Sequence, residues 1–135
     1  MSWEDWRNNE EVWRPAMDSI LSAARSFSAE HPEMDIGIVP LAWDAPDVEL
    51  HWNNGQLSRN LHATLEGTQW PLTVRYTGAV WRDAGGERQS RGHDFGSVTA
   101  SGLDELRAKL PGDIASAVEQ ITGLLLHASR SASAD

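Results

Sequence analysis

The segment VELHWNNGQLSRNL, residues 48–61, is the clearest indication of the fold. In its first half the apolar residues Val48, Leu50 and Trp52 alternate with polar ones, which is the period of a strand with one buried and one wet face. Asn54-Gly55 then supplies the pair of positive-φ residues that a two-residue type I′ turn requires. The segment therefore predicts an antiparallel hairpin.

A tight turn at Asn54-Gly55 also fixes the register of this hairpin. It places Val48 opposite Leu61, Leu50 opposite Arg59 and Trp52 opposite Leu57, and five of these six side chains are apolar. They define the face expected to be buried. The other face is polar and sets His62 opposite Asp47 and His51 opposite Ser58.

The alternation continues along the chain. A third strand is expected to direct Leu72, Val74, Tyr76 and Val80 inward. Pro71 lacks an amide hydrogen, so a longer loop or a bulge is expected before this strand instead of a two-residue turn. Asp83-Ala84-Gly85-Gly86 predicts another turn, and residues 87–100, interrupted by Gly92 and Gly96, predict a bulged or edge strand.

Apolar residues recur at helical intervals near both ends of the chain. Pro15 interrupts the N-terminal pattern, which predicts a short helix before Arg14 and a longer one from Pro15 to about Glu30. Pro111-Gly112 either kinks the C-terminal helix or restarts it. Capping boxes are expected at both starts, from Ser2 with Asp5 and from Ser101 with Asp104.

These elements predict a two-layer α+β fold. An antiparallel meander of four or five strands is flanked by N-terminal and C-terminal helices that pack on one sheet face. The last residues are low in complexity, so we expect one domain over residues 1–128 and a disordered tail over residues 129–135.

Composition disfavours several classes of function. The chain has 135 residues, no cysteine and a net charge of −9. The acidic start lacks the pattern of a secretory signal, and the longest apolar stretch, residues 36–43, is far below the roughly 20 residues of a membrane span. We therefore expect a cytoplasmic protein without a membrane segment. The negative charge disfavours nucleic acid as a partner.

The charge is concentrated in one part of the chain. Residues 1–50 carry 11 acids and 3 bases, whereas residues 51–100 carry 4 acids and 5 bases. Solubility alone can account for such an excess. An acidic surface that binds a basic partner is the alternative.

Catalytic signals are few. The sequence has no nucleophile-elbow, zinc-protease, phosphate-loop or dinucleotide motif, and we expect no cofactor. His62 beside Asp47, or His93 beside Asp94, offers a weak acid–base pair, although such pairs also occur on solvated sheets. A metal site from Asp47, Glu49, His51 and His62 is disfavoured, because a flat sheet face splays its ligands apart.

Tryptophan is unusually frequent, with seven residues. Trp3, Trp6, Trp13 and Trp52 fit the buried faces of the predicted elements. Trp43, Trp70 and Trp81 fall in loops or at polar-face positions, where an indole can anchor a partner or stack on a sugar. The alternative is that these three cover the edges of a small core.

Basic charge gathers on the later strands, at Arg75, Arg82, Arg88 and Arg91. These residues are suited to an acidic ligand or to the acidic segment of a second copy, which allows a homodimer. A charged sheet edge that resists aggregation is the alternative.

Three functions remain open. The first is a non-catalytic acidic protein-interaction module of an immunity-, adaptor- or chaperone-like kind. The second is a small-molecule-binding domain whose cavity lies between sheet and helices. The third is a histidine-dependent enzyme. The residues expected in the cavity of the second are Trp52, Leu61, Tyr76 and Phe95, and the expected partner-binding residues of the first include Trp43, Trp70, Trp81 and Arg75.

Overall fold

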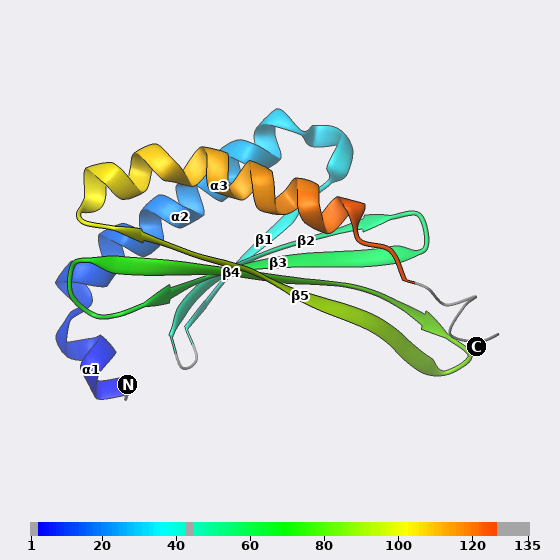
Figure 1. The fold of residues 1–135 in the computed structure, drawn as a ribbon, viewed down its shortest axis with the longest axis horizontal. Coiled ribbons are helices and arrows are strands. Elements are labelled where there is room, and N and C mark those ends of the chain that lie inside the picture. Colours follow the sequence, from blue (N-terminus) through cyan, green and yellow to red (C-terminus); the bar gives the residue numbers. More distant parts are fainter. Residues whose placement is uncertain (1–2, 43–44, 127–135) are drawn as a thin grey trace.

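A computed structural model describes residues 3–42 and 45–126. It confirms the two-layer α+β fold, with all five strands of the meander present (Figure 1). The helical elements are α1 (Trp3–Asn8), α2 (Glu10–Glu30), a 3-10 turn η1 (Pro32–Met34) and α3 (Leu103–Gly123). The strands are β1 (Gly37–Ala42), β2 (Pro46–Asn54), β3 (Leu57–Glu66), β4 (Leu72–Ala84) and β5 (Glu87–Ala100). In the described residues no helix is long and apolar enough to cross a membrane.

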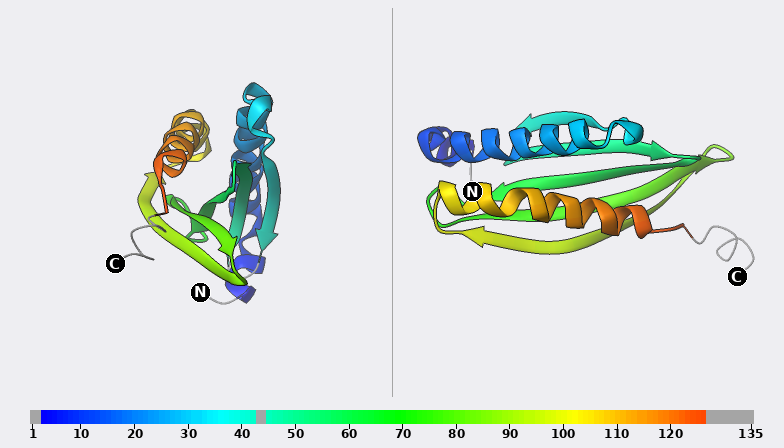
Figure 2. Two further views of the ribbon diagram at one scale, coloured as in Figure 1. Left: turned by 90° about the vertical axis from the view of Figure 1, so that its right-hand side faces the viewer. Right: turned by 90° about the horizontal axis from the view of Figure 1, so that it is seen from above.

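The sheet has the order β1-β2-β3-β4-β5, and every neighbouring pair is antiparallel. It is strongly twisted and curls around the two long helices, which run side by side over one face (Figure 2). We call the face beneath α2 and α3 the inner face and the opposite one the outer face.

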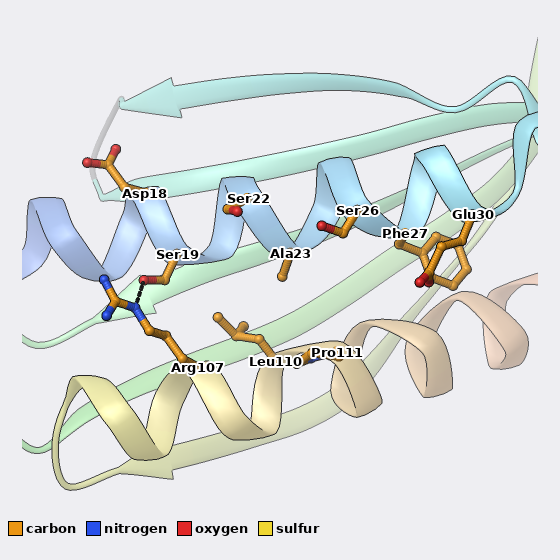
Figure 3. A pocket seen from close by; sticks show the side chains of 10 residues that line it. All are labelled: Asp18, Ser19, Ser22, Ala23, Ser26, Phe27, Glu30, Arg107, Leu110 and Pro111. Carbon is orange, nitrogen blue, oxygen red and sulfur yellow. Dashed lines mark hydrogen bonds between the residues drawn. The ribbon is translucent and has the colours of Figure 1, made fainter.

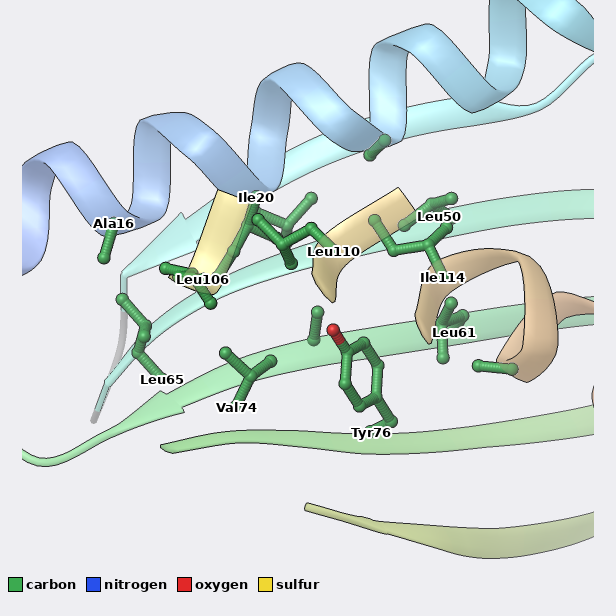
Figure 4. Close-up of a cluster of buried hydrophobic side chains, with 14 of the residues drawn as sticks. Ala16, Ile20, Leu50, Leu61, Leu65, Val74, Tyr76, Leu106, Leu110 and Ile114 are labelled. Atoms are coloured by element: carbon green, nitrogen blue, oxygen red, sulfur yellow. The ribbon is translucent and has the colours of Figure 1, made fainter. Parts of the chain in front are cut away.

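The core lies between the inner face and the helices. On β3 the inward side chains Leu61, Ala63 and Leu65 are fully buried, whereas the outward Asn60 and His62 are half-buried. Ile20 of α2 and Leu106, Leu110 and Ile114 of α3 close this layer from above (Figure 4). The predicted inward residues of β4, namely Leu72, Val74, Tyr76 and Val80, are all buried.

The predicted register of the first hairpin is wrong by two residues. Leu50 lies opposite Leu61 and Trp52 opposite Arg59, because the turn is Gly55-Gln56 and not Asn54-Gly55. Gly55 has φ 67° in the first turn position, which fits a type II′ turn. A shift of two residues keeps every side chain on its predicted face.

The remaining connections match the sequence expectations. Residues 67–71 form a loop longer than a two-residue turn, and Gly85-Gly86, both with positive φ, link β4 to β5. β5 is an edge strand whose register with β4 shifts between Arg75 and Thr77. Gly96, with φ 89°, lies at that bulge.

The helix boundaries differ from the predictions. The N-terminal break falls at Asn9, and α2 continues through Pro15. Pro15 removes only one backbone hydrogen bond, and burial of Trp13, Ala16 and Ile20 outweighs that loss. α3 likewise runs through Pro111 without a restart.

The predicted capping box from Ser101 and Asp104 is not formed, because the N-cap of α3 is Gly102, which has no side-chain cap hydrogen bond. Ser101 precedes the N-cap, and its amide and hydroxyl donate to Glu105 at 2.7 and 3.2 Å. The box at Ser2 and the tail over residues 129–135 lie outside the described residues.

The C-terminal end of α3 is held on the sheet by two contacts. Ile121 packs over Gly78, where a Cβ atom would lie only 2.7 Å from the Asn60 carbonyl oxygen and would also collide with Ile121. Beside it, the buried Arg59 guanidinium donates to the carbonyls of Thr122 and Leu124 at 3.1 and 3.0 Å. A cation at a helix C-terminus opposes the negative end of the helix dipole.

We expect Gly78→Ala to lower the free energy of unfolding by about 1–3 kcal/mol, because the added methyl group overpacks the contact with Ile121. Gly92→Ala is the matched control, since its Cβ would meet only the Gly78 carbonyl oxygen at 3.8 Å. Urea denaturation measures both. Equal losses in the two variants would contradict this account of how α3 is seated.

Candidate functional site

The outer face of the sheet is the first candidate site. Within residues 3–42 and 45–126, no helix packs on it (Figure 2). Its two central strands present polar side chains that are only half-buried by their neighbours. They are Asp47 and Glu49 of β2, and Ser58, Asn60, His62 and Thr64 of β3.

His62 lies at the centre of a polar cluster on this face. Its Nδ1 is 2.6 Å from Asp47 Oδ2, and its Nε2 is 3.3 Å from the Asn60 amide nitrogen and 3.5 Å from Glu49 Oε2. Thr64 donates to the other oxygen of Asp47 at 3.1 Å. The hydrogen bond to Asp47 is the main cause that raises the pKa of His62 above its ordinary value.

The contact between His62 and Asp47 was predicted from the sequence, but through a strand register that is wrong. In the structure His62 lies opposite Glu49, and Asp47 lies opposite Thr64. Asp47 still reaches His62 diagonally, because cross-strand diagonal neighbours are within range of polar side chains.

This geometry favours a structural role for the histidine. Both ring nitrogens already face polar partners, and those partners are carboxylates and an amide, not a nucleophile. His93 and Asp94 have separate partners: the ring of His93 contacts Phe95, while Asp94 accepts from Arg75 and from the Gly96 amide. In the described residues no group of three or more His, Cys, Asp or Glu is placed to hold a metal ion.

A shallow hollow of about 370 Å³ adjoins the His62 cluster. Arg88 lies over the indole of Trp81, 5.5 Å from the ring centroid, and also donates to Asp83. The hollow is lined by Glu49, Asn60, Ala79, Trp81, Arg88 and Ser90. Glu49 and Asn60 belong to both features, so we treat the hollow and the cluster as one outer-face site.

The four arginines of the later strands do not form one basic patch. Arg75 and Arg88 point outward, and Arg75 is bonded to Glu66 at 2.9 Å and to Asp94 at 2.8 Å. Arg82 and Arg91 lie at the alternate, inward positions, where Arg82 donates to Gln89 and Arg91 to the Leu125 carbonyl. Arg75 therefore offers no unpaired charge to an acidic ligand.

The structure separates the tryptophans and the expected cavity residues. Trp81 lies at the outer-face site, Trp70 is half-buried against the core, and Trp43 is outside the described residues. Trp52 lines a pocket near the β2–β3 turn, whereas Tyr76 and Phe95 line a hollow of about 100 Å³ between α3 and β5. Leu61 is fully buried, so these residues do not share one cavity.

A groove of about 570 Å³ runs between α2 and α3 (Figure 3). Ser19, Ser22 and Ser26 of α2 line one side, and Arg107 reaches across from α3 to donate to the Ser19 hydroxyl at 3.1 Å. This groove could not be predicted from the sequence, because its width depends on the distance between two helices that are far apart in the chain.

Asn60 and Ser90 line the outer-face site but were not among the site residues predicted from the sequence. Both are polar residues at polar positions of a strand, and only the strand register reveals that they surround Trp81. The period-two pattern placed Asn60 on the wet face, which was the one available signal.

Comparisons with known proteins give no relative from which a role could be transferred. No protein family, curated protein or solved structure matches this chain significantly.

We expect Tyr76→Phe to leave the free energy of unfolding unchanged or to raise it by about 1 kcal/mol. The Tyr76 hydroxyl is buried without a hydrogen-bond partner in the described structure, and burial raises the pKa of this phenol, so the phenol stays neutral. Urea denaturation measures the change. A clear loss of stability would show that the hydroxyl makes an important bond.

The His62 cluster predicts a pH-dependent contribution to stability. Because folding raises the pKa of His62, its stabilisation is fully present below the ordinary pKa and is lost as the pH rises through the folded-state value. We expect His62→Gln to destabilise the protein by about 1 kcal/mol more at pH 5.5 than at pH 8.5.

Urea denaturation at the two pH values measures the His62→Gln effect. His51→Gln is the control, because His51 is an exposed histidine of the same strand pair. A pH-independent effect at His62, or an equal pH dependence at His51, would refute the linkage.

Proposed function

We propose that the protein is a non-catalytic protein-interaction module whose outer-face site binds a basic surface of a partner protein. The observation that carries this proposal is a half-exposed indole, Trp81, in a hollow on an uncovered sheet face, with the Glu49 carboxylate and the Asn60 amide at its rim. Buried aromatic anchors surrounded by polar groups supply most of the energy in many interfaces.

The charges of the outer face support a basic partner. Five carboxylates face two arginines there, and both arginines are already in ion pairs. The carboxylates are those of Asp47, Glu49, Glu66, Asp83 and Asp94. Such an excess steers basic surfaces toward the site and makes the association sensitive to salt.

The acidic residues of the N-terminal helix α2 lie on the other side of the sheet from this site. α2 packs over the inner face against β1 and β2, so its carboxylates add to the overall negative charge of the protein and not to the charge of the outer face. A net charge of −9 also opposes binding to nucleic acid. The proposal extends to a cytoplasmic protein of an immunity-, adaptor- or chaperone-like kind, consistent with a chain that has no cysteine.

The test is capture of proteins from a host lysate on the immobilised protein. We expect Trp81→Ala to weaken capture of one stoichiometric partner at least tenfold, because loss of a hot-spot anchor costs about 2 kcal/mol or more. Its Tm should stay close to that of the wild type. Raising the salt concentration should weaken capture by the wild type.

Leu125→Ala is the matched control, since it truncates an apolar side chain that is 56% exposed outside the outer-face site. Carboxylate footprinting of the captured complex should protect Glu49 and Asp47. Undiminished capture by Trp81→Ala, or a complex that leaves both carboxylates reactive, would overturn the proposed surface.

A further inference from the structure

A second pocket lies on the inner side of the sheet, away from the outer-face site. It has a volume of about 510 Å³, within the range of small-molecule sites. We call it the turn-end pocket, because it lies where α2, η1, the end of β2 and the second half of α3 meet. Its lining includes Phe27, Met34 and Trp52, and also Glu33, Ala115 and Glu119.

The pocket has an apolar and aromatic floor. Trp52 is only 4% exposed and lies beside Val118 of α3 in the core. The rings of Phe27 and His31 stack with their centroids 4.3 Å apart. Together with the thioether of Met34, these groups suit an aromatic or aliphatic body.

The rim of the pocket is negative. Glu33 and Glu119 line it from two different elements, η1 and α3. α2 ends here, and its last turn has no basic residue to offset the negative end of its dipole. In the described structure neither lysine nor arginine lines the pocket, and His31, 3.5 Å from Glu33, is the one ionisable nitrogen in the lining.

Arg59 is a buried cation next to this pocket, but it is not part of the lining. It lies opposite Trp52 on β3, is 1% exposed and donates from Nη2 to the carbonyls of Thr122 and Leu124. Its Nε and Nη1 are buried without a partner in the described structure, so the carboxylates and not this cation are the charged groups that a ligand in the pocket meets.

From this combination we propose that the turn-end pocket binds a small hydrophobic amine in its protonated form. The apolar floor takes the hydrocarbon body, and the ammonium group lies at the rim between Glu33 and Glu119. The lining comes from four elements that converge around one space, which favours a compact ligand over an extended chain. This site is separate from the outer-face site, so either proposal can fail alone.

The test uses three probes of the same shape and different charge: 4-phenylbutylamine, 4-phenylbutan-1-ol and 4-phenylbutyrate. Isothermal titration at low salt, supported by amide chemical shifts, measures their binding to the full chain. We expect the amine to bind about tenfold more tightly than the alcohol, and the carboxylate to bind most weakly.

Variants locate the binding. Ala115 is exposed at the rim, so Ala115→Phe should fill the pocket and abolish amine binding without unfolding the protein. Glu33→Gln and Glu119→Gln should each weaken it about threefold, the effect of a partly exposed ion pair. Glu87→Gln, at the distant β4–β5 turn, is the charge-matched control and should change nothing.

Four outcomes would overturn the proposal. The first is failure of the amine to bind the wild type, the second is equal binding of all three probes, and the third is amine binding that survives Ala115→Phe. The fourth is a combination: the amine does not bind the wild type, and Ala115→Phe no longer captures the partner from a lysate. The last would show that the pocket holds a side chain of a protein partner. Loss of amine binding in Ala115→Phe with partner capture intact supports the proposal independently of the outer-face site.

Discussion

The two layers of the protein are held in place by the contact between the end of α3 and the inner face of the sheet. Ile121 reaches the backbone of β4 because Gly78 has no side chain there, and Arg59 binds the carbonyls that end the helix. Burying a guanidinium is costly, and burial lowers the pKa of Arg59, so its bonds to two carbonyls must offset that cost. With α3 seated in this way, the inner face is covered and Val118 and Thr122 form a wall of the turn-end pocket.

The division of the sheet into two faces explains where the functional groups lie. The apolar side chains of the central strands lie on the inner face and pack against α2 and α3, so the polar side chains of these strands lie on the outer face. His62 and its neighbouring carboxylates stabilise the outer face, because five polar side chains of β2 and β3 form hydrogen bonds with one another across the two strands. Trp81 departs from this polar pattern, and a half-buried indole on an uncovered sheet face gains from a partner that buries the rest of it.

The fold was predicted correctly because the strongest signal in the sequence is the alternation of apolar and polar residues with a period of two. A misplaced turn or helix boundary does not change which face a strand residue occupies. Asn54-Gly55 is a favourable turn pair. Shifting the turn by one residue instead places Leu50 opposite Leu61 and Trp52 opposite Arg59 on the buried face, and we attribute the observed register to this pairing. Pro15 and Pro111 remained inside helices for the same reason: a buried stripe outweighs one missing hydrogen bond. The pocket and the hollow could not be predicted, because each joins residues from elements far apart in the chain, such as Phe27 with Glu119.

The structure shows where individual carboxylates of this acidic chain lie, and these positions bear on what the negative charge can bind. Asp47 and Glu49 pair with His62 on the outer face, and Glu33 and Glu119 line the turn-end pocket. Glu49 shares its hollow with Trp81, and Glu33 and Glu119 share their pocket with Trp52. Solubility requires charge but not this pairing with indoles. In both proposals the carboxylates attract a positively charged group and the indole contacts its apolar stem, so both proposals give the excess of acid a role in recognition.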